Sequence, residues 1–240
     1  KEMRDEAKLV PDEIMYNSLL DGCAQSSLVD DGLRVLREME DAQVKPSNFT
    51  LSVLVKLMSR ARKVDAAFEL VKELSEKYHL SPNSHVYANL VQACCFSKQL
   101  QRGLKTLEEM MERKVQPDKR TYSMLLRLAV QQCQFEKADG LLRGALGVSG
   151  ALPFLNTPWA VCQGVEETAL SETLSSMASS PEGNKAAAGF LVDVRKENPK
   201  IWIDPAVQRG VLQGTGAPSA SWNTERRPSK GKGKGKGQRA

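Results

Sequence analysis

Apolar residues recur at helical spacing in short segments that are separated by polar turns. In residues 16–23 they stand at i, i+3, i+4 and i+7, as Tyr16, Leu19, Leu20 and Cys23, which is the pattern of an α-helix with one buried face. A second segment, roughly 29–41, shows the same period, and the residues between the two segments are polar. The pattern predicts two helices joined by a short turn.

This pair of segments repeats along the chain. Prolines stand at Pro11, Pro46, Pro82 and Pro117, with spacings of 35, 36 and 35 residues, and proline does not continue a helix. Several other columns keep the same steps: Tyr16, Leu51, Tyr87 and Tyr122; Leu19, Leu54, Leu90 and Leu125; Leu20, Val55, Val91 and Leu126; Gly32, Ala67, Gly103 and Ala138; and Met39, Leu74 and Met110. Columns in phase over four units predict a repeat protein.

Each unit is expected to form a helical hairpin that cannot bury its apolar stripe alone. Stacking of neighbouring hairpins buries the stripe and gives a solenoid. The small residue in the Gly32 column would let the second helix of each unit approach the first closely. The predicted fold class is therefore all-α, a right-handed α-solenoid of helix-turn-helix repeats over about residues 1–147.

The units resemble those of the pentatricopeptide repeat family. The resemblance rests on the segment 11–22, on the small residue midway through each unit, and on the ending Met39…Val44-Lys45-Pro46. The tetratricopeptide repeat fits less well, because its period is about 34 and it starts with a Trp motif, whereas residues 1–147 contain no Trp. The divisions we expect are the end of a preceding repeat at 1–12, repeats at 13–47, 48–83 and 84–118, a degenerate terminal repeat at 119–147, a weakly structured segment with short helices at 148–209, and a disordered Lys/Gly-rich tail at 210–240.

The resemblance implies binding of single-stranded RNA, with one base read per repeat by two or three side chains. In the family the fifth and the last residue of a unit face the base. Carried over, the base-reading candidates are Asn17 with Ser47, Ser52 with Asn83, Ala88 with Asp118, Ser123, and Asp12 as the last residue of the unit before. By the same analogy the first pair prefers cytidine and the second prefers adenosine. Ala88 has no polar side-chain atom, so the third unit is expected to read weakly.

The second position of each unit is implied to cover a base face. Its occupants are Ile14, Phe49, His85 and Arg120, and stacking on an aromatic side chain contributes about 1–3 kcal/mol per base. Simpler explanations remain open for all these residues. Small polar residues after a proline commonly cap helices, Phe49 is equally suited to a core, and His85 to an ordinary surface.

Charge separates the repeats from the C-terminal end of the chain. The 240 residues carry a formal net charge of +5, but residues 221–240 hold seven basic residues and one acidic one, so residues 1–220 are close to neutral. Lys230, Lys232, Lys234 and Lys236 alternate with glycine. Such a tail suits non-specific contact with RNA phosphates, and a purely solubilising role is an equal alternative. Short helices are expected near 159–176 and 185–196, the second as a cap on the last repeat.

Other chemistry finds little support in the sequence. The five cysteines include no Cys-x-x-Cys motif, and Cys23 and Cys94 share a buried repeat column, so neither a metal site nor a cofactor is expected. No apolar run has the roughly 20 residues of a membrane span, and the carboxylates are scattered rather than clustered. We therefore expect no enzymatic activity.

The leading hypothesis is a sequence-selective RNA-binding adaptor of a mitochondrion or plastid, acting in RNA processing, stability, editing or translation. A solenoid that binds protein partners, and a non-catalytic fragment of a larger RNA-processing enzyme, remain alternatives. The chain starts at Lys1 rather than Met, and we expect a longer parent protein.

Overall fold

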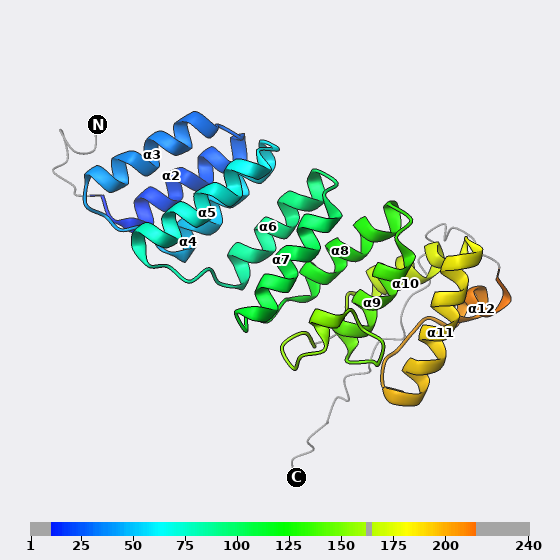
Figure 1. Ribbon diagram of the computed structural model, residues 1–240. Coiled ribbons are helices and arrows are strands. Elements are labelled where there is room, and N and C mark those ends of the chain that lie inside the picture. Colours follow the sequence, from blue (N-terminus) through cyan, green and yellow to red (C-terminus); the bar gives the residue numbers. More distant parts are fainter. Residues whose placement is uncertain (1–10, 162–164, 215–240) are drawn as a thin grey trace, which may run out of the picture.

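The described part of the protein is built from α-helices joined by short loops. The computed structural model describes residues 11–161 and 165–214, and within these ranges there is no β-strand. The first helices of successive hairpins are α2 (Glu13–Ser26), α4 (Asn48–Arg60), α6 (Ser84–Phe96), α8 (Lys119–Gln131) and α10 (Glu167–Ala178). The second helices are α3 (Val29–Asp41), α5 (Val64–Tyr78), α7 (Leu100–Glu112), α9 (Phe135–Leu146) and α11 (Pro181–Glu197), and α12 (Pro205–Gln213) follows (Figure 1).

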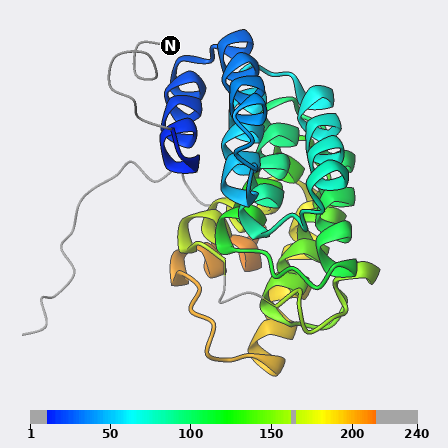
Figure 2. The same cartoon turned by 90° about the vertical axis from the view of Figure 1, so that its left-hand side faces the viewer.

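The hairpins stack in chain order. Helix α2 packs against α4, α4 against α6, α6 against α8 and α8 against α10, so the first helices form one continuous row. Helix α12 packs on α10 and thus takes the place of a further first helix. Seen from a second side, the helices of the early hairpins run alongside one another (Figure 2). The prediction of an all-α solenoid of helical hairpins is confirmed.

The repeated apolar columns form the core between the stacked hairpins. In the Tyr16 column, Tyr16, Leu51, Tyr87 and Tyr122 are all at most 3% exposed. The two leucine and valine columns are buried in the same way except at Leu19, which is 48% exposed. Its equivalents are covered by the preceding first helix, and α2 is the first helix of the row that the structure describes.

The column of small residues marks a close approach between successive hairpins, whereas the sequence predicted that it serves the approach of the two helices within one hairpin. A Cβ atom added at Gly32 would lie 2.4 Å from Leu57 Cδ2, and one added at Gly103 would lie 2.8 Å from Leu125 Cδ2. In both cases the neighbour belongs to the first helix of the next unit. The small residue therefore lets the second helix of one unit pack against the following unit as well as against its own partner.

Turns within the hairpins share one backbone conformation. Ser27, Arg62, Lys98 and Cys133 have φ between 54° and 57°, and each occupies the same repeat position. In each turn the next residue donates its N–H to a carbonyl five residues back, for example Leu28 N to Cys23 O at 2.9 Å. These bonds satisfy carbonyls at the helix end. The repeated turn fixes the angle between the two helices in every unit.

The fourth and fifth hairpins are joined by a longer connection that packs into α9. Added Cβ atoms at Gly140 and Gly144 would lie 2.7 Å from Leu152 Cγ and 2.6 Å from Leu155 Cδ1. These two glycines, one turn apart, thus make room for the connection against the helix. Arg143, on the same helix, donates to Asp139 and Asp193 at 2.8 Å each, which ties α9 to α11.

The weak sequence pattern after residue 119 does not prevent regular structure. Residues 119–147 form the hairpin α8–α9, and Gly147 ends it with φ 67°. Residues 148–209 include α10, the 17-residue α11 and most of α12. The helices lie at Glu167–Ala178 and Pro181–Glu197, displaced from the expected ranges 159–176 and 185–196, because Pro181 starts α11 and Ser180 caps it. Helix α11 packs on α9. The Lys/Gly tail, including Lys230, Lys232, Lys234 and Lys236, lies outside the described residues.

Candidate nucleic-acid interface

The last residue of each predicted unit caps the first helix of the next. Asp12 Oδ1 accepts from Met15 N at 2.9 Å, and Ser47 Oγ accepts from Phe49 N at 3.1 Å. Asn83 Oδ1 accepts from His85 N at 3.1 Å, while Asp118 Oδ1 accepts from Thr121 N at 2.7 Å. The capping explanation therefore holds for the whole column, and it also fixes these side chains at the edge of the first helices.

The predicted stacking residues all lie on the surface of the first helices. Ile14 is 74% exposed and Phe49 is 62% exposed, and His85 and Arg120 are exposed as well. Since each occupies the second position of its helix, together they form a row of protruding side chains. Phe49 is thus not a core residue. We call the surface that carries this row the groove face.

Three hollows lie on the groove face, and the protruding residues separate them. Phe49 borders both a hollow beside Asn17 and the central hollow, and Arg120 borders both the central hollow and one that reaches to the end of α8. His85 stands within the central hollow. Phe49 and Arg120 therefore mark the borders between the hollows, and the central hollow extends over two repeat intervals with His85 inside it.

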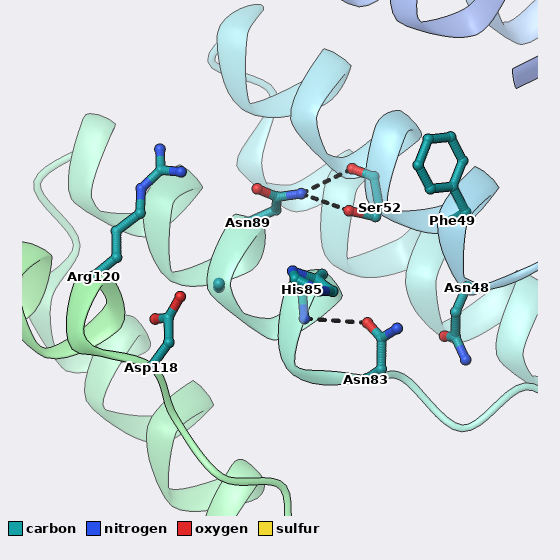
Figure 3. Close-up of a pocket in the computed structure, with 9 residues that line it drawn as sticks. Asn48, Phe49, Ser52, Asn83, His85, Asn89, Asp118 and Arg120 are labelled. Carbon is teal, nitrogen blue, oxygen red and sulfur yellow. Dashed lines mark hydrogen bonds between the residues drawn. The ribbon is translucent and has the colours of Figure 1, made fainter. Parts of the chain in front are cut away.

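The central hollow gathers half of the predicted base-reading residues, namely Ser52, Asn83, Ala88 and Asp118. It has a volume of about 310 Å³ and is lined by Asn48, Phe49, Ser52, Asn83, His85, Ala88, Asn89, Asp118 and Arg120. Figure 3 shows Phe49 on one side and Arg120 on the other, with Ser52 and Asn83 between them. Ser52 and Asn83 are 31 residues apart in sequence. The repeat thus brings the fifth and last residues of one unit together.

Hydrogen bonds leave the Ser52 and Asn83 pair with donors directed at a ligand. Asn89 Nδ2 donates to Ser52 Oγ at 2.9 Å and to Ser52 O at 3.0 Å, so the Ser52 hydroxyl already accepts and its own hydrogen is available. Asn83 uses Oδ1 for capping, and among the described residues its Nδ2 group donates to no protein acceptor. Two donors therefore face the hollow.

The remaining fifth-position residues are less accessible. Asn17 is 5% exposed, and its Nδ2 donates to Glu13 Oε1 at 3.2 Å, whereas its Oδ1 has no acceptor role among the described residues. Ser123 is 1% exposed and donates to Lys119 O at 2.8 Å, one turn back in its own helix. Ala88 lines the central hollow together with His85 and Arg120 and supplies only an apolar surface.

Charged residues on the groove face are paired between neighbouring units. Lys56 Nζ lies 2.8 Å from Asp21 Oδ1, and this hydrogen bond lowers the pKa of Asp21. Arg127 Nε lies 3.0 Å from Glu172 Oε2, and its Nη2 lies 3.8 Å from Glu166 Oε2. Because the partners are all solvent-accessible, each pair contributes little to stability. These pairs hold Lys56 and Arg127 close to the groove, and another anion can replace their carboxylate partners.

The remaining candidates for chemistry are the cysteine thiols and groups of possible metal ligands among the described residues. Burial raises the pKa of Cys94 to about 11 and that of Cys95 to about 12, which keeps both thiols protonated at neutral pH. Among residues 11–161 and 165–214 no three His, Cys, Asp or Glu side chains lie close enough to hold a metal ion. In the same ranges no helix has both the length and the apolarity needed to cross a bilayer.

Some groove residues escaped the sequence analysis. Asn89 donates a hydrogen bond to Ser52 and thereby positions it. Lys56 and Arg127 supply positive charge, and Phe96 is an exposed aromatic residue at the end of α6. The period itself could have indicated them, since Asp21, Lys56, Gln92 and Arg127 share one repeat position. Their partners lie on adjacent helices, so these pairings depend on how neighbouring units stack and not on the sequence of any one unit.

The stacked hairpins and the hollows of the groove face define a helical-repeat protein that presents one set of side chains per unit. Residues 2–143 match the family profile described as "Pentacotripeptide-repeat region of PRORP". The chain belongs to the pentatricopeptide repeat family, as its sequence columns suggested.

Curated relatives come from plants and fungi. A pentatricopeptide repeat-containing protein of Arabidopsis thaliana is 26% identical over 130 residues, covering 53% of this chain and 23% of its own. The mitochondrial 15S rRNA processing factor ppr3 of Schizosaccharomyces japonicus is 25% identical over 135 residues, covering 55% of this chain and 20% of its own. The chain thus spans less than a quarter of the length of either relative.

Solved structures show the same fold. The pentatricopeptide repeat protein PPR10 from maize aligns with a TM-score of 0.64 and 17% identity, over 85% of this chain and 26% of PPR10. The PPR domain of Arabidopsis thaliana protein-only RNase P 1, solved in complex with tRNA, aligns with a TM-score of 0.60 and 16% identity, over 84% of this chain and 97% of that domain. Both alignments extend past the four predicted units, which agrees with the fifth hairpin α10–α11.

Proposed function

We propose that the protein binds single-stranded RNA along the groove face, one base per repeat, and selects bases at the Ser52–Asn83 pair. The observation that carries the proposal is the central hollow, where this pair lies between Phe49 and His85. A base placed there would be covered on both faces and met at its edge by polar groups. This arrangement is the one that recognition of unstacked bases requires.

Donor chemistry supports a defined preference at this position. The available hydrogen of Ser52 suits an acceptor on the Watson–Crick edge, such as N1 of adenine or N3 of cytosine, whereas the corresponding nitrogens of guanine and uracil carry hydrogens. Together with the family analogy, this favours adenosine at the second unit. The first unit, with Asn17 and Ser47, is proposed to prefer cytidine. Ala88 with Asp118 is proposed to contribute stacking with little selection.

The biological setting is proposed from the relatives. Several are named as chloroplastic or mitochondrial proteins, and one as a mitochondrial rRNA processing factor. We propose that this chain serves in processing, stability, editing or translation of an organellar transcript, without chemistry of its own. The Lys/Gly tail would add contacts to phosphates that do not depend on sequence.

Binding of a short RNA tests the proposal. Anisotropy titrations would use the full chain, a fluorescent 12-nucleotide RNA containing a cytidine–adenosine step, and the same sequence as a duplex. We expect the single strand to bind more tightly and the double variant Ser52→Ala/Asn83→Gly to lose roughly 30-fold, since each of the two lost hydrogen bonds contributes about 1 kcal/mol. Ser171→Ala, on α10, is the matched control. Equal binding of duplex and single strand, or an unaffected double variant, would refute the proposal.

A further inference from the structure

A third hollow on the groove face combines an exposed aromatic side chain with cations. It lies between α6 and α8 towards the ends of these helices, and its volume is about 500 Å³. Phe96, the last residue of α6, is 51% exposed and lines it together with polar and charged residues, which are Gln92, Lys98, Arg120, Arg127, Gln131 and the single carboxylate Glu166. The wall opposite the solvent includes the apolar side chains of Met124 and Leu128.

This combination occurs once among the described hollows of the groove face. The repeat position of Phe96 is occupied by Gln25, Arg60 and Gln131 in the other units, and Arg60 is bound to the carbonyls of Ala24 and Gln25. The hollow beside Asn17 contains the carboxylates Glu13 and Asp21. The hollow beside Asn17 has no Lys or Arg in its lining, and the central hollow has Arg120 alone. An exposed aromatic face with three cations in the same lining therefore occurs, among the described hollows of the groove face, only between α6 and α8.

We infer that this third hollow binds one additional nucleotide of the RNA, with its base stacked on Phe96 and its phosphate between Arg127 and Lys98. The inference rests on the proposed RNA binding, and it adds a contact outside the row of fifth and last residues. Aromatic stacking accepts any base, so the site adds affinity without selecting sequence. Gln92 and Gln131 line the same hollow.

Arg127 is available to the phosphate in spite of its carboxylate partners. Its contact with Glu166 is 3.8 Å long, and the Arg127, Glu166 and Glu172 side chains are 43%, 42% and 60% exposed. Ion pairs of this kind contribute at most about 1 kcal/mol, whereas a phosphate offers the guanidinium charge-assisted hydrogen bonds. The phosphate would replace Glu166 and leave the closer contact with Glu172 in place.

Abasic scanning of the RNA tests this site directly. The full chain and its Phe96→Ala and Phe96→Tyr variants would be titrated with 12-nucleotide RNAs in which one base at a time is removed. We expect Phe96→Ala to weaken binding of the intact RNA about 5- to 150-fold, the range for loss of one stacked base, and Phe96→Tyr to stay within about twofold of the wild type. One abasic position should weaken the wild type and leave Phe96→Ala unchanged.

The control is Trp202→Ala, because Trp202 is an aromatic residue that is 60% exposed and lies between α11 and α12, away from the hollow. It should bind like the wild type. If Phe96→Ala also binds like the wild type, or if every abasic position costs both proteins equally, the third hollow holds no base. If the wild type binds no RNA, the proposed function fails as well. Loss of binding in Ser52→Ala/Asn83→Gly with an unaffected Phe96→Ala would overturn this inference alone.

Discussion

Removal of the Asn89 amide should reduce discrimination between adenosine and guanosine without removing any residue that faces the base. Asn89 Nδ2 donates to both oxygens of Ser52, at 2.9 and 3.0 Å (Figure 3). While this amide is present, it occupies one of the two acceptor positions of the Ser52 hydroxyl, and this favours donation of the hydroxyl hydrogen to a ligand in the groove. In Asn89→Ala the hydroxyl is free to rotate, and it can accept from guanine N1 as readily as it donates to adenine N1.

The size of the effect follows from one hydrogen bond. A net contribution of about 1 kcal/mol corresponds to roughly a fivefold change in the ratio of the two dissociation constants. The assay is a titration of the full chain with four RNAs that differ only in the base facing the second unit. We expect the preference for adenosine over guanosine to fall about fivefold in Asn89→Ala, mainly through tighter binding of the guanosine RNA.

Asn48→Ala is the matched control for this prediction. Asn48 lines the same hollow with the same kind of side chain, but its Nδ2 donates to Ser81 O at 3.0 Å and makes no contact with Ser52. It should keep the preference of the wild type. An unchanged preference in Asn89→Ala, in a wild-type protein that does discriminate, would show that Ser52 does not act as an oriented donor.

Three further predictions concern charge, backbone and thiols. Asp21→Asn should release Lys56 for phosphate contact and steepen the slope of log Kd against log salt concentration by about 0.7, whereas Asp41→Asn, at an exposed position, should leave this slope unchanged. Since the pKa of Asp21 is lowered, any stability from the pair is present above the ordinary pKa of 3.8 and disappears as the pH falls through the pKa of the folded state. Acid titrations of the wild type and the variant would check this. Gly22→Ala should stabilise the protein by about 1 kcal/mol, because no atom lies within 4 Å of the new Cβ. Gly183→Ala should destabilise it by about 1–3 kcal/mol, because its Cβ would lie 2.5 Å from Met177 O. Urea unfolding measures both changes, and the opposite order of stabilities would contradict the packing at these two glycines. Iodoacetamide at pH 8 should modify the exposed Cys133 and spare Cys94 and Cys95, whose pKa values are about 11 and 12. Peptide mapping that finds all three modified at equal rates would show that the thiols of Cys94 and Cys95 are not protected by burial.

The repeat was predictable because its cause is local and recurs. A buried column such as Tyr16, Leu51, Tyr87 and Tyr122 appears at a fixed interval, and each copy supports the interpretation of the others. The fifth hairpin was harder to recognise, because a connection packed around Gly140 and Gly144 interrupts the interval. Both of its helices bury apolar residues, and α11 is capped by Ser180, but no repeat column continues into them in phase.

Side chains that act across two units could not be assigned from the sequence. The period assigns Ser52 and Asn83 to the fifth and the last position of one unit, and the structure shows them in one hollow. That Asn89 orients Ser52, or that Glu172 pairs with Arg127, depends on the offset between adjacent helices, which no single unit encodes. The same holds for Asn17 and Ser123, whose burial reflects the helices packed beside them.

Selection from a pool of random RNA sequences tests the central claim most directly. Wild-type protein should enrich a cytidine followed by adenosine, since the first two units lie next to each other along the groove face. The variant Ser52→Val, which replaces the oriented hydroxyl by a methyl group and adds a second methyl group, should lose the adenosine and keep the cytidine. A pool that stays random, or an adenosine preference that survives in Ser52→Val, would mean that successive helices do not present their fifth residues to successive bases.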